Sequence, residues 1–212
     1  MTADEAPSGG DGETPIQNAA CLILIDRSGA DARVLMGRRL ASQVFLPNKW
    51  VFPGGRVDQG DHERAAANAD GHLPFILAAV RETYEEAGLS IVDLNDSKAC
   101  AALSDCVKPL ARAITPPGFP RRFDTWFYVA DWDRSRPPTG TPDGELLDLD
   151  WFTLAEVAAL DLPYITRLIV DDVAMVIAAG DRTSASDVPF YFQAVDGYAR
   201  TLISPNWPRP QP

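Results

Sequence analysis

The most regular hydrophobic pattern in the chain lies between residues 76 and 87. Apolar residues recur there every three or four positions, which is the spacing of one face of an α-helix. Tyr84 falls on this apolar face, whereas Glu82, Glu85 and Glu86 fall on the opposite side. The pattern therefore predicts a helix with one face in the hydrophobic core and a cluster of carboxylates on the other.

Other hydrophobic runs predict a sheet and a second long helix. Continuous apolar runs of strand length, at 19–25 and 33–39, are typical of central strands that are covered on both faces. Helical spacing returns between 162 and 179 and stops at Gly180, and this helix provides either core packing or a dimer surface. The further predicted strands are 50–52, 89–92, 110–114, 121–130, 144–152 and 188–193.

Glycine and proline mark where several of these elements end. The run Pro53-Gly54-Gly55 follows strand 50–52 directly and is a strong turn signal. Gly71 and Pro74 predict that a helix breaks before residue 74 and restarts near it. Two further signals are a helix C-cap at Gly88 and a capping box formed by Thr153 and Glu156.

The composition is that of a globular protein with one well-buried domain. Of the 212 residues, 46% are hydrophobic and 23% are charged, which is an ordinary balance for a folded domain. Residues 1–14 hold four acids and no bases and predict a disordered tail, and residues 204–212 form a proline-rich tail. We therefore place a single domain at residues 15–203.

Net charge and cysteine usage narrow the function classes. A net charge of −11 argues against a nucleic-acid-binding surface, which needs a basic footprint. No apolar run reaches about 18 residues and no signal peptide is evident, so we expect neither a membrane span nor secretion. Three cysteines without a Cys-x-x-Cys pair indicate reduced thiols and a cytoplasmic protein. The two histidines, His62 and His72, are expected to face solvent rather than bind metal.

The three glutamates of the 76–87 helix repel one another and need a counter-charge. Arg81 lies one turn before Glu85 and supplies one positive charge, but an excess of negative charge remains. A divalent cation such as Mg²⁺ neutralises such an excess and prefers carboxylate and carbonyl oxygens. The alternative is a solvated acidic face on an α/β protein that binds no metal.

Together with the glycine pair, these residues resemble the Nudix box of the Nudix hydrolases. The second half of the box is Arg81-Glu82-Thr83-Tyr84-Glu85-Glu86-Ala87-Gly88-Leu89, and the whole box extends over residues 54–89. Asp61 stands where the family has glutamate, and Thr83 replaces an aliphatic residue. An insertion at about 62–74 lengthens the box, as in members similar to coenzyme A and dinucleotide diphosphatases. The role of Asp61 is left open.

The resemblance implies a fold, a metal and a set of site residues. It implies an α/β/α sandwich around a mixed β-sheet, with Mg²⁺ or Mn²⁺ held by Glu82, Glu85, Glu86 and the carbonyl of Gly54. Arg81 orients a glutamate through a charge-assisted hydrogen bond. The general base is Glu85 or Glu145, with Asp143, Asp148 and Asp150 as competitors for the role of Glu145. The candidate phosphate contacts are Arg38, Arg39, Arg56 and Arg122.

The reaction implied is metal-dependent hydrolysis of a diphosphate linkage in a nucleotide-derived small molecule, giving two phosphorylated products. The lengthened box and the run from Thr115 to Thr125 favour a coenzyme A compound or NADH; ADP-ribose, a nucleotide sugar or a nucleoside triphosphate are alternatives. A regulatory domain that binds a nucleotide without hydrolysing it is a second reading, and a homodimer is a possible assembly. Trp126, Phe127 and Phe119 either stack on an adenine or belong to the core.

Overall fold

The computed structural model describes residues 14–66, 68, 70–180, 187–194 and 197–205. The acidic tail expected at 1–14 and the proline-rich tail expected at 204–212 lie almost wholly outside the described residues. Within the part of the chain that is described, no helix is long and apolar enough to cross a membrane.

The centre of the fold is strand β1 (Ile16–Asp26), which lies in a mixed sheet with strand order β3-β2-β1-β6-β5-β8-β9. β1 runs parallel to β6 (Arg122–Asp131) along almost its whole length. β5 (Lys108–Ile114) continues the sheet, followed by the hairpin of β8 (Val188–Ala194) and β9 (Gly197–Ile203). Because β1 is central, its side chains are buried on both faces, as its continuous apolar run predicts.

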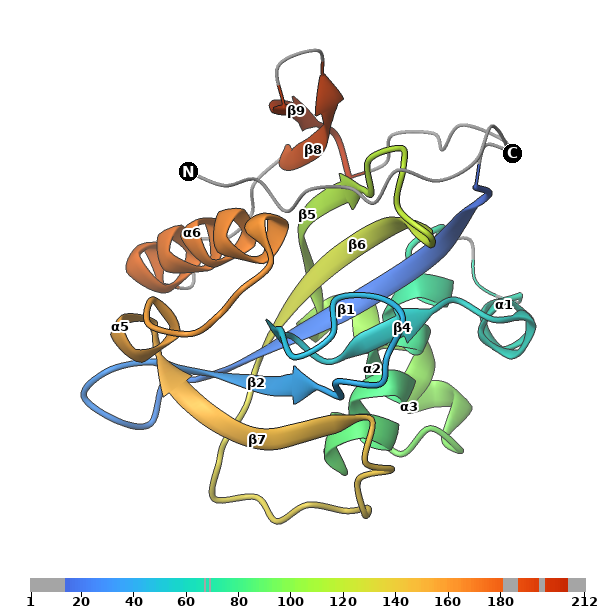
Figure 1. Ribbon diagram of the computed structural model, residues 1–212. Helices are drawn as coiled ribbons and strands as arrows, with labels where there is room; N and C mark the ends of the chain where they lie inside the picture. Colours follow the sequence, from blue (N-terminus) through green and yellow to red (C-terminus); the bar gives the residue numbers. More distant parts are fainter. Residues whose placement is uncertain (1–13, 67, 69, 181–186, 195–196, 206–212) are drawn as a thin grey trace.

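The sheet divides where β1 meets β2 (Arg33–Arg39). These two strands pair only at Ile25 and Asp26 of β1, and β2 then diverges to pair with β3 (Trp50–Val51) and β7 (Leu146–Thr153). β4 (Gly54–Arg56) pairs with the part of β1 that β2 leaves unpaired. Figure 1 shows β2 and β7 running apart from β1 and β6. The divergence places β4, and with it the glycine pair, at the centre of the sheet.

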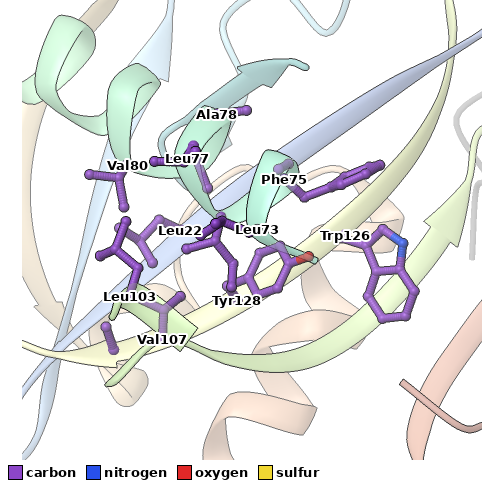
Figure 2. Packing of buried hydrophobic residues seen from close by; sticks show 14 of the residues in the cluster. Leu22, Leu73, Phe75, Leu77, Ala78, Val80, Leu103, Val107, Trp126 and Tyr128 are labelled. Atoms are coloured by element: carbon purple, nitrogen blue, oxygen red, sulfur yellow. The ribbon is translucent and has the colours of Figure 1, made fainter. Parts of the chain in front are cut away.

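Helices cover both faces of the sheet. α2 (Leu73–Ala87) packs on one face with α1 (Gln59–Ala65), α3 (Ser97–Ala101) and α4 (Leu103–Cys106), and α5 (Leu154–Val157) and α6 (Tyr164–Ala179) lie on the other (Figure 1). β1 alternates accordingly: Leu22 and Leu24 belong to the core under α2, and Ile23 and Ile25 belong to the core under α6. Figure 2 shows Leu22 packed with Leu73 and Tyr128. This arrangement is the predicted α/β/α sandwich around a mixed sheet.

Several predicted boundaries are confirmed because they depend on local chemistry. The insertion breaks the helix into α1 and α2, and Pro74 stands in the first turn of α2. Gly88 adopts a left-handed conformation with φ 69°, and a Cβ there would lie 2.4 Å from the Gly140 carbonyl oxygen. Thr153 and Glu156 form the expected capping box at α5. α6 ends at Gly180.

Other predictions are wrong, and each error has a tertiary cause. Residues 89–92 form an irregular loop, because Ile91 and Val92 pack partly against the core without a strand partner. Tyr84 is 38% exposed and lies against Gly140 on the surface. His72 is half-buried at the start of α2, within 2.7 Å of the Tyr128 hydroxyl and 2.6 Å of the Pro205 carbonyl. β9 was not predicted at all.

Trp126 and Phe127 are buried in the two cores, which supports the packing interpretation over adenine stacking.

Candidate active site

The last two turns of α2 present three glutamates toward β4, but in different environments. Glu86 is 3% exposed and points to the sheet, the Glu82 side chain is 19% exposed, and the Glu85 side chain is 45% exposed. Glu82 and Glu86 lie one turn apart, so they share a face, and Glu85 flanks them. The predicted carboxylate face therefore extends from a buried residue, Glu86, to a largely exposed one, Glu85.

The glycine pair allows α2 and β1 to approach β4 closely. The Gly54 amide donates a hydrogen bond of 2.9 Å to Glu86 Oε2. A Cβ on Gly54 would lie 2.4 Å from the Ala20 carbonyl oxygen, and one on Gly55 would lie 2.3 Å from Glu82 Cδ. Because real Cβ atoms do not come this close, only glycine permits these contacts. The glycine turn that the sequence predicts is therefore the part of the backbone against which Glu82 and Glu86 pack.

Glu86 lacks a cationic partner at hydrogen-bond distance among the described residues. Burial raises the pKa of Glu86 to about 8, against the opposing effect of the Gly54 hydrogen bond, and the negative charge of Glu82 raises it further. Burial also raises the pKa of Glu82, although Arg81 acts to lower it. Negative charge therefore exceeds positive charge in the immediate surroundings of the Glu86 carboxyl.

Arg81 connects the helix to the rest of the site. Its guanidinium donates to Asp61 Oδ2 at 3.0 Å, to Glu82 Oε1 at 2.9 Å, to Glu85 Oε2 at 3.1 Å and to the Arg56 carbonyl at 3.0 Å. Arg81 therefore lies within hydrogen-bond distance of two glutamates, as its predicted orienting role requires. Asp61 is 1% exposed and is fixed in turn by a capping box with Asp58 at the start of α1.

Glu145 lies in the turn that precedes β7. The Asp143 amide donates to the Glu85 carbonyl at 2.9 Å, which attaches this turn to α2. The negative charge of Glu145 raises the pKa of both Glu82 and Glu86, so its carboxylate lies near them. The competing acids are engaged elsewhere, because Asp148 pairs with Arg38 and Asp150 accepts a hydrogen bond from the Trp151 amide.

The four candidate arginines have separate environments. Arg38 points to Asp148, with nitrogen–oxygen distances of 2.6 and 2.8 Å. Arg39 is half-buried, and its Nε atom donates to the Phe45 carbonyl at 3.0 Å; burial lowers its pKa, while the charges of Glu86 and Glu145 oppose that effect. Arg56 borders a polar hollow together with Arg81 and Glu82. Arg122 is 7% exposed and donates to the Thr115 carbonyl, so it holds the start of β6.

Comparisons with known proteins show similarity to Nudix hydrolases. No known protein-family profile matches the chain. The chain is 31% identical over 159 residues to nudix hydrolase 7 of Caenorhabditis elegans, a match that covers 64% of this chain and 50% of that protein. A NUDIX hydrolase structure from Alicyclobacillus acidocaldarius matches 77% of this chain and 93% of its own, with 25% identity and a TM-score of 0.62.

The chain has the Nudix fold, and its sequence is similar to those of Nudix hydrolases. It spans about half the length of the curated relative that it matches. The Nudix domain of NrtR from Shewanella oneidensis, solved with ADP ribose, shares the Nudix fold at 14% identity and a TM-score of 0.53 over 76% of this chain and 88% of that chain.

The donor set of this region matches a divalent cation in its chemistry. Carboxylate oxygens are the ligands that Mg²⁺ and Mn²⁺ prefer, and the raised pKa of Glu86 indicates a shortage of positive charge. Among the described residues, however, no three acidic, histidine or cysteine side chains converge on one point. Arg81 holds Glu82 and Glu85 while Glu86 turns to Gly54. The chemistry of these residues therefore fits a divalent cation, whereas the positions of their side chains in this structure do not bring three of them together.

The sequence left the role of one residue of this region open, Asp61, and gave no signal for another, Cys21. Asp61 stands at an altered box position, and the structure shows it holding Arg81 from a separate helix. Cys21 lies in β1 opposite Gly54, and burial raises the pKa of its thiol to about 12, with Glu86 and Glu82 adding to the effect. No sequence spacing connects Cys21 to the Nudix box, because the strand register brings them together.

Proposed function

We propose that this chain is a metal-dependent hydrolase that cleaves a diphosphate linkage in a nucleotide-derived substrate and releases two phosphorylated products. The observation that carries this proposal is the buried Glu86 carboxyl, which rests on the Gly54 amide beside the negative charges of Glu82 and Glu145. Buried carboxyl groups with strongly raised pKa values cluster at functional sites. A solvated acidic surface would not bury Glu86.

We assign Glu82, Glu85, Glu86 and the carbonyl of Gly54 as ligands of Mg²⁺ or Mn²⁺. When bound, the cation supplies neutralisation of phosphate charge and a lowered pKa for an attacking water. Arg81 positions Glu82 and Glu85 through its hydrogen bonds. The proton of the water passes to Glu85 or Glu145, the two most exposed carboxylates of the site.

Arginines supply the remaining positive charge toward the substrate. Arg39 is a candidate phosphate contact, because its charge lies close to the Glu86 and Glu145 carboxylates. Arg56 is a second candidate phosphate contact, because it borders the polar hollow beside Glu82. We keep Arg38 and Arg122 as weaker candidates, since one is paired with Asp148 and the other is buried against Thr115.

For the substrate we favour a coenzyme A compound or NADH. The support is the lengthened box, which the structure resolves as the break between α1 and α2, and the irregular segment 115–120. A nucleotide diphosphate of some kind is also in keeping with the ADP ribose bound by the related NrtR domain. We further propose a cytoplasmic protein, in keeping with its three free thiols, and a homodimer through α6, where Met175 is 68% exposed.

A second candidate function is nucleotide binding without hydrolysis. The observation that favours it is that Arg81 already engages Glu82 and Glu85, and that no three metal-binding side chains among the described residues converge on one point. In a regulatory domain this arrangement would persist when metal and nucleotide bind.

A substrate panel separates the two functions. Coenzyme A, NADH, ADP-ribose and nucleoside triphosphates are incubated with the protein and Mg²⁺ or Mn²⁺, and product masses are measured. We expect cleavage at a diphosphate linkage, fastest with coenzyme A or NADH. Binding of a panel member without any monophosphate product would overturn the hydrolase in favour of the regulatory domain.

A further inference from the structure

The 132–145 segment joins β6 to β7 and ends at Glu145, a candidate proton acceptor that lies outside α2 (Figure 1). It contains neither a helix nor a strand. Connections of this length without regular structure are uncommon in compact domains and are often functional. The place of Glu145 in the site therefore depends on what holds this segment.

The C-terminal end of α2 holds the 132–145 segment. The last carbonyl groups of an α-helix have no donor within the helix and need partners outside it. Thr139 and Gly140 donate their amides to the Gly88 carbonyl at 2.8 and 3.1 Å. Further along the segment, Asp143 donates its amide to the Glu85 carbonyl at 2.9 Å. The segment therefore caps the helix that carries the three glutamates.

Two glycines let the segment lie directly on the last turn of α2. A Cβ on Gly140 would lie 2.6 Å from Cε2 of Tyr84, and a Cβ on Gly88 would lie 2.4 Å from the Gly140 carbonyl oxygen. Because real Cβ atoms do not come this close, a larger residue at either position would displace the segment from the helix. The contact between segment and helix is thus a close one, made by backbone atoms.

Asp143 connects Glu145 to this docked segment. Its Oδ1 atom accepts the Glu145 amide at 2.9 Å, which is the hydrogen bond of an Asx turn. Its own amide is the one bound to the Glu85 carbonyl. Asp143 therefore fixes the backbone of Glu145 relative to that of Glu85 through two hydrogen bonds. From the other side, Gln43 Nε2 lies 3.5 Å from the Glu145 carbonyl oxygen.

The carboxylates of Glu85 and Glu145 differ in their partners. Glu85 Oε2 accepts a hydrogen bond from Arg81 at 3.1 Å. The Glu145 carboxylate, by contrast, makes no hydrogen bond or ion pair with the residues that the structure describes. Because no side-chain contact orients this carboxylate, its place in the site depends on the backbone that carries it.

We infer that Asp143 is a positioning residue, whose amide fixes it to α2 and whose Oδ1 atom fixes the backbone of Glu145. The inference rests on the proposed function, because it assigns the proton of the attacking water to Glu145. The water oxygen bonds to phosphorus, the bond from that phosphorus to the bridging oxygen breaks, and the water proton passes to the Glu145 carboxylate. In this role Asp143 needs an oxygen acceptor at Oδ1, and its negative charge is not required.

Two substitutions separate the acceptor from the charge. Asp143→Asn keeps an oxygen acceptor and loses the charge, whereas Asp143→Ala loses both. The steady-state constants kcat and KM are measured with coenzyme A, NADH and ADP-ribose in the presence of Mg²⁺. We expect Asp143→Ala to lower kcat about tenfold to a hundredfold, with KM changed by less than about twofold, because Glu145 moves out of place. Asp143→Asn should retain most of the wild-type kcat.

A matched control lies in the same segment. Asp133 is exposed, and its Oδ1 atom accepts the Ser135 amide at 2.8 Å, which is the same kind of turn hydrogen bond. Asp133→Ala therefore removes an equivalent bond before the contacts with α2 begin. We expect this variant to keep the wild-type kcat. Melting curves of all the variants establish that they are folded.

A double-mutant cycle tests whether Asp143 acts through Glu145. Glu145→Gln alone should lower kcat about 10²–10⁴-fold, as for loss of a general base. Adding Asp143→Ala to Glu145→Gln should lower kcat by less than about twofold more, because the group that Asp143 positions has already lost its function. Full additivity of the two losses would show that Asp143 acts independently of Glu145.

The outcomes separate this inference from the proposed function. If the wild-type protein turns over, the inference is overturned by Asp143→Asn being as slow as Asp143→Ala, by additive losses, or by a wild-type rate in Glu145→Gln. Each of these results leaves the hydrolase standing. A wild-type protein that cleaves none of the substrates overturns the proposed function, and the role of Asp143 falls with it.

Discussion

Two arginine-centred clusters in this molecule differ in their charge balance. Arg112 and Asp124 form a buried pair with nitrogen–oxygen distances of 2.8 and 2.6 Å, and the guanidinium also lies over the rings of Trp126 and Phe190. One positive charge meets one negative charge, and both groups are held by packing. Arg81 instead meets Asp61, Glu82 and Glu85 at once, and the adjoining Glu86 has no cationic side chain at hydrogen-bond distance in the part of the chain that is described. A balanced buried pair supports structure, whereas an excess of carboxylates leaves room for a cation.

The largest expected effect is on turnover at the unbalanced cluster. Glu85→Gln removes a charge from a 45% exposed side chain, so the fold should persist while kcat falls by about 10²–10⁴-fold, as for loss of a metal ligand or general base. Rates of monophosphate release with Mg²⁺, together with a melting curve, measure both parts. Unchanged turnover in Glu85→Gln would remove Glu85 from the site.

The balanced cluster is expected to show its effect in stability. Arg112→Met leaves the Asp124 carboxylate buried without its partner, and we expect a loss of about 3–5 kcal/mol in the free energy of unfolding. The double variant Arg112→Met/Asp124→Leu should recover most of this loss, because no unpaired charge remains. Urea denaturation of the three proteins measures it. A double variant as unstable as the single one would contradict the pairing argument.

A smaller effect is expected from the positioning residue Asp61. In Asp61→Asn the side chain keeps its size but loses the charge that holds Arg81, so Arg81 is less firmly directed at Glu82 and Glu85. We expect kcat to fall about tenfold to a hundredfold and the pH–rate profile to shift, with KM little changed. Asp61→Glu, which restores the charge, should recover part of the rate. A purely structural Asp61 would alter the melting temperature without moving the pH profile.

The smallest effect concerns pH in the metal-free protein. Burial raises the pKa of Glu86 to about 8, whereas an unfolded glutamate ionises near pH 4.5. The folded chain therefore binds more protons than the unfolded chain between these values, and its stability should fall as pH rises from about 5 to 8. Glu86→Gln should flatten this fall, and added Mg²⁺ should reduce it in the native protein. Melting temperatures across this range test it, and an equal slope in Glu86→Gln would exclude Glu86 as its source.

Elements with strong local signals were predicted well. The break before Pro74, the left-handed Gly88, the Thr153–Glu156 capping box and the pairing of Arg81 with Glu85 all involve residues within one or two turns. Residues 89–92 were wrongly predicted as a strand and β9 was missed, because strand formation depends on a partner that local spacing cannot reveal. The placing of Tyr84 in the core failed because that side of α2 meets only the Gly140 turn at the surface and leaves Tyr84 partly exposed.

By itself, the sequence determined that one helix carries a core face and three glutamates beside a glycine turn, because those spacings are internal to short segments. Tertiary structure alone decided which glutamate is buried, that Asp61 holds Arg81, and that Glu145 and Arg39 stand near Glu86. It also decided that Cys21 lies against Gly54. These relations follow from the register of β1 with β4 and from the divergence of β2, since pairing between distant strands sets distances that no spacing along the chain encodes.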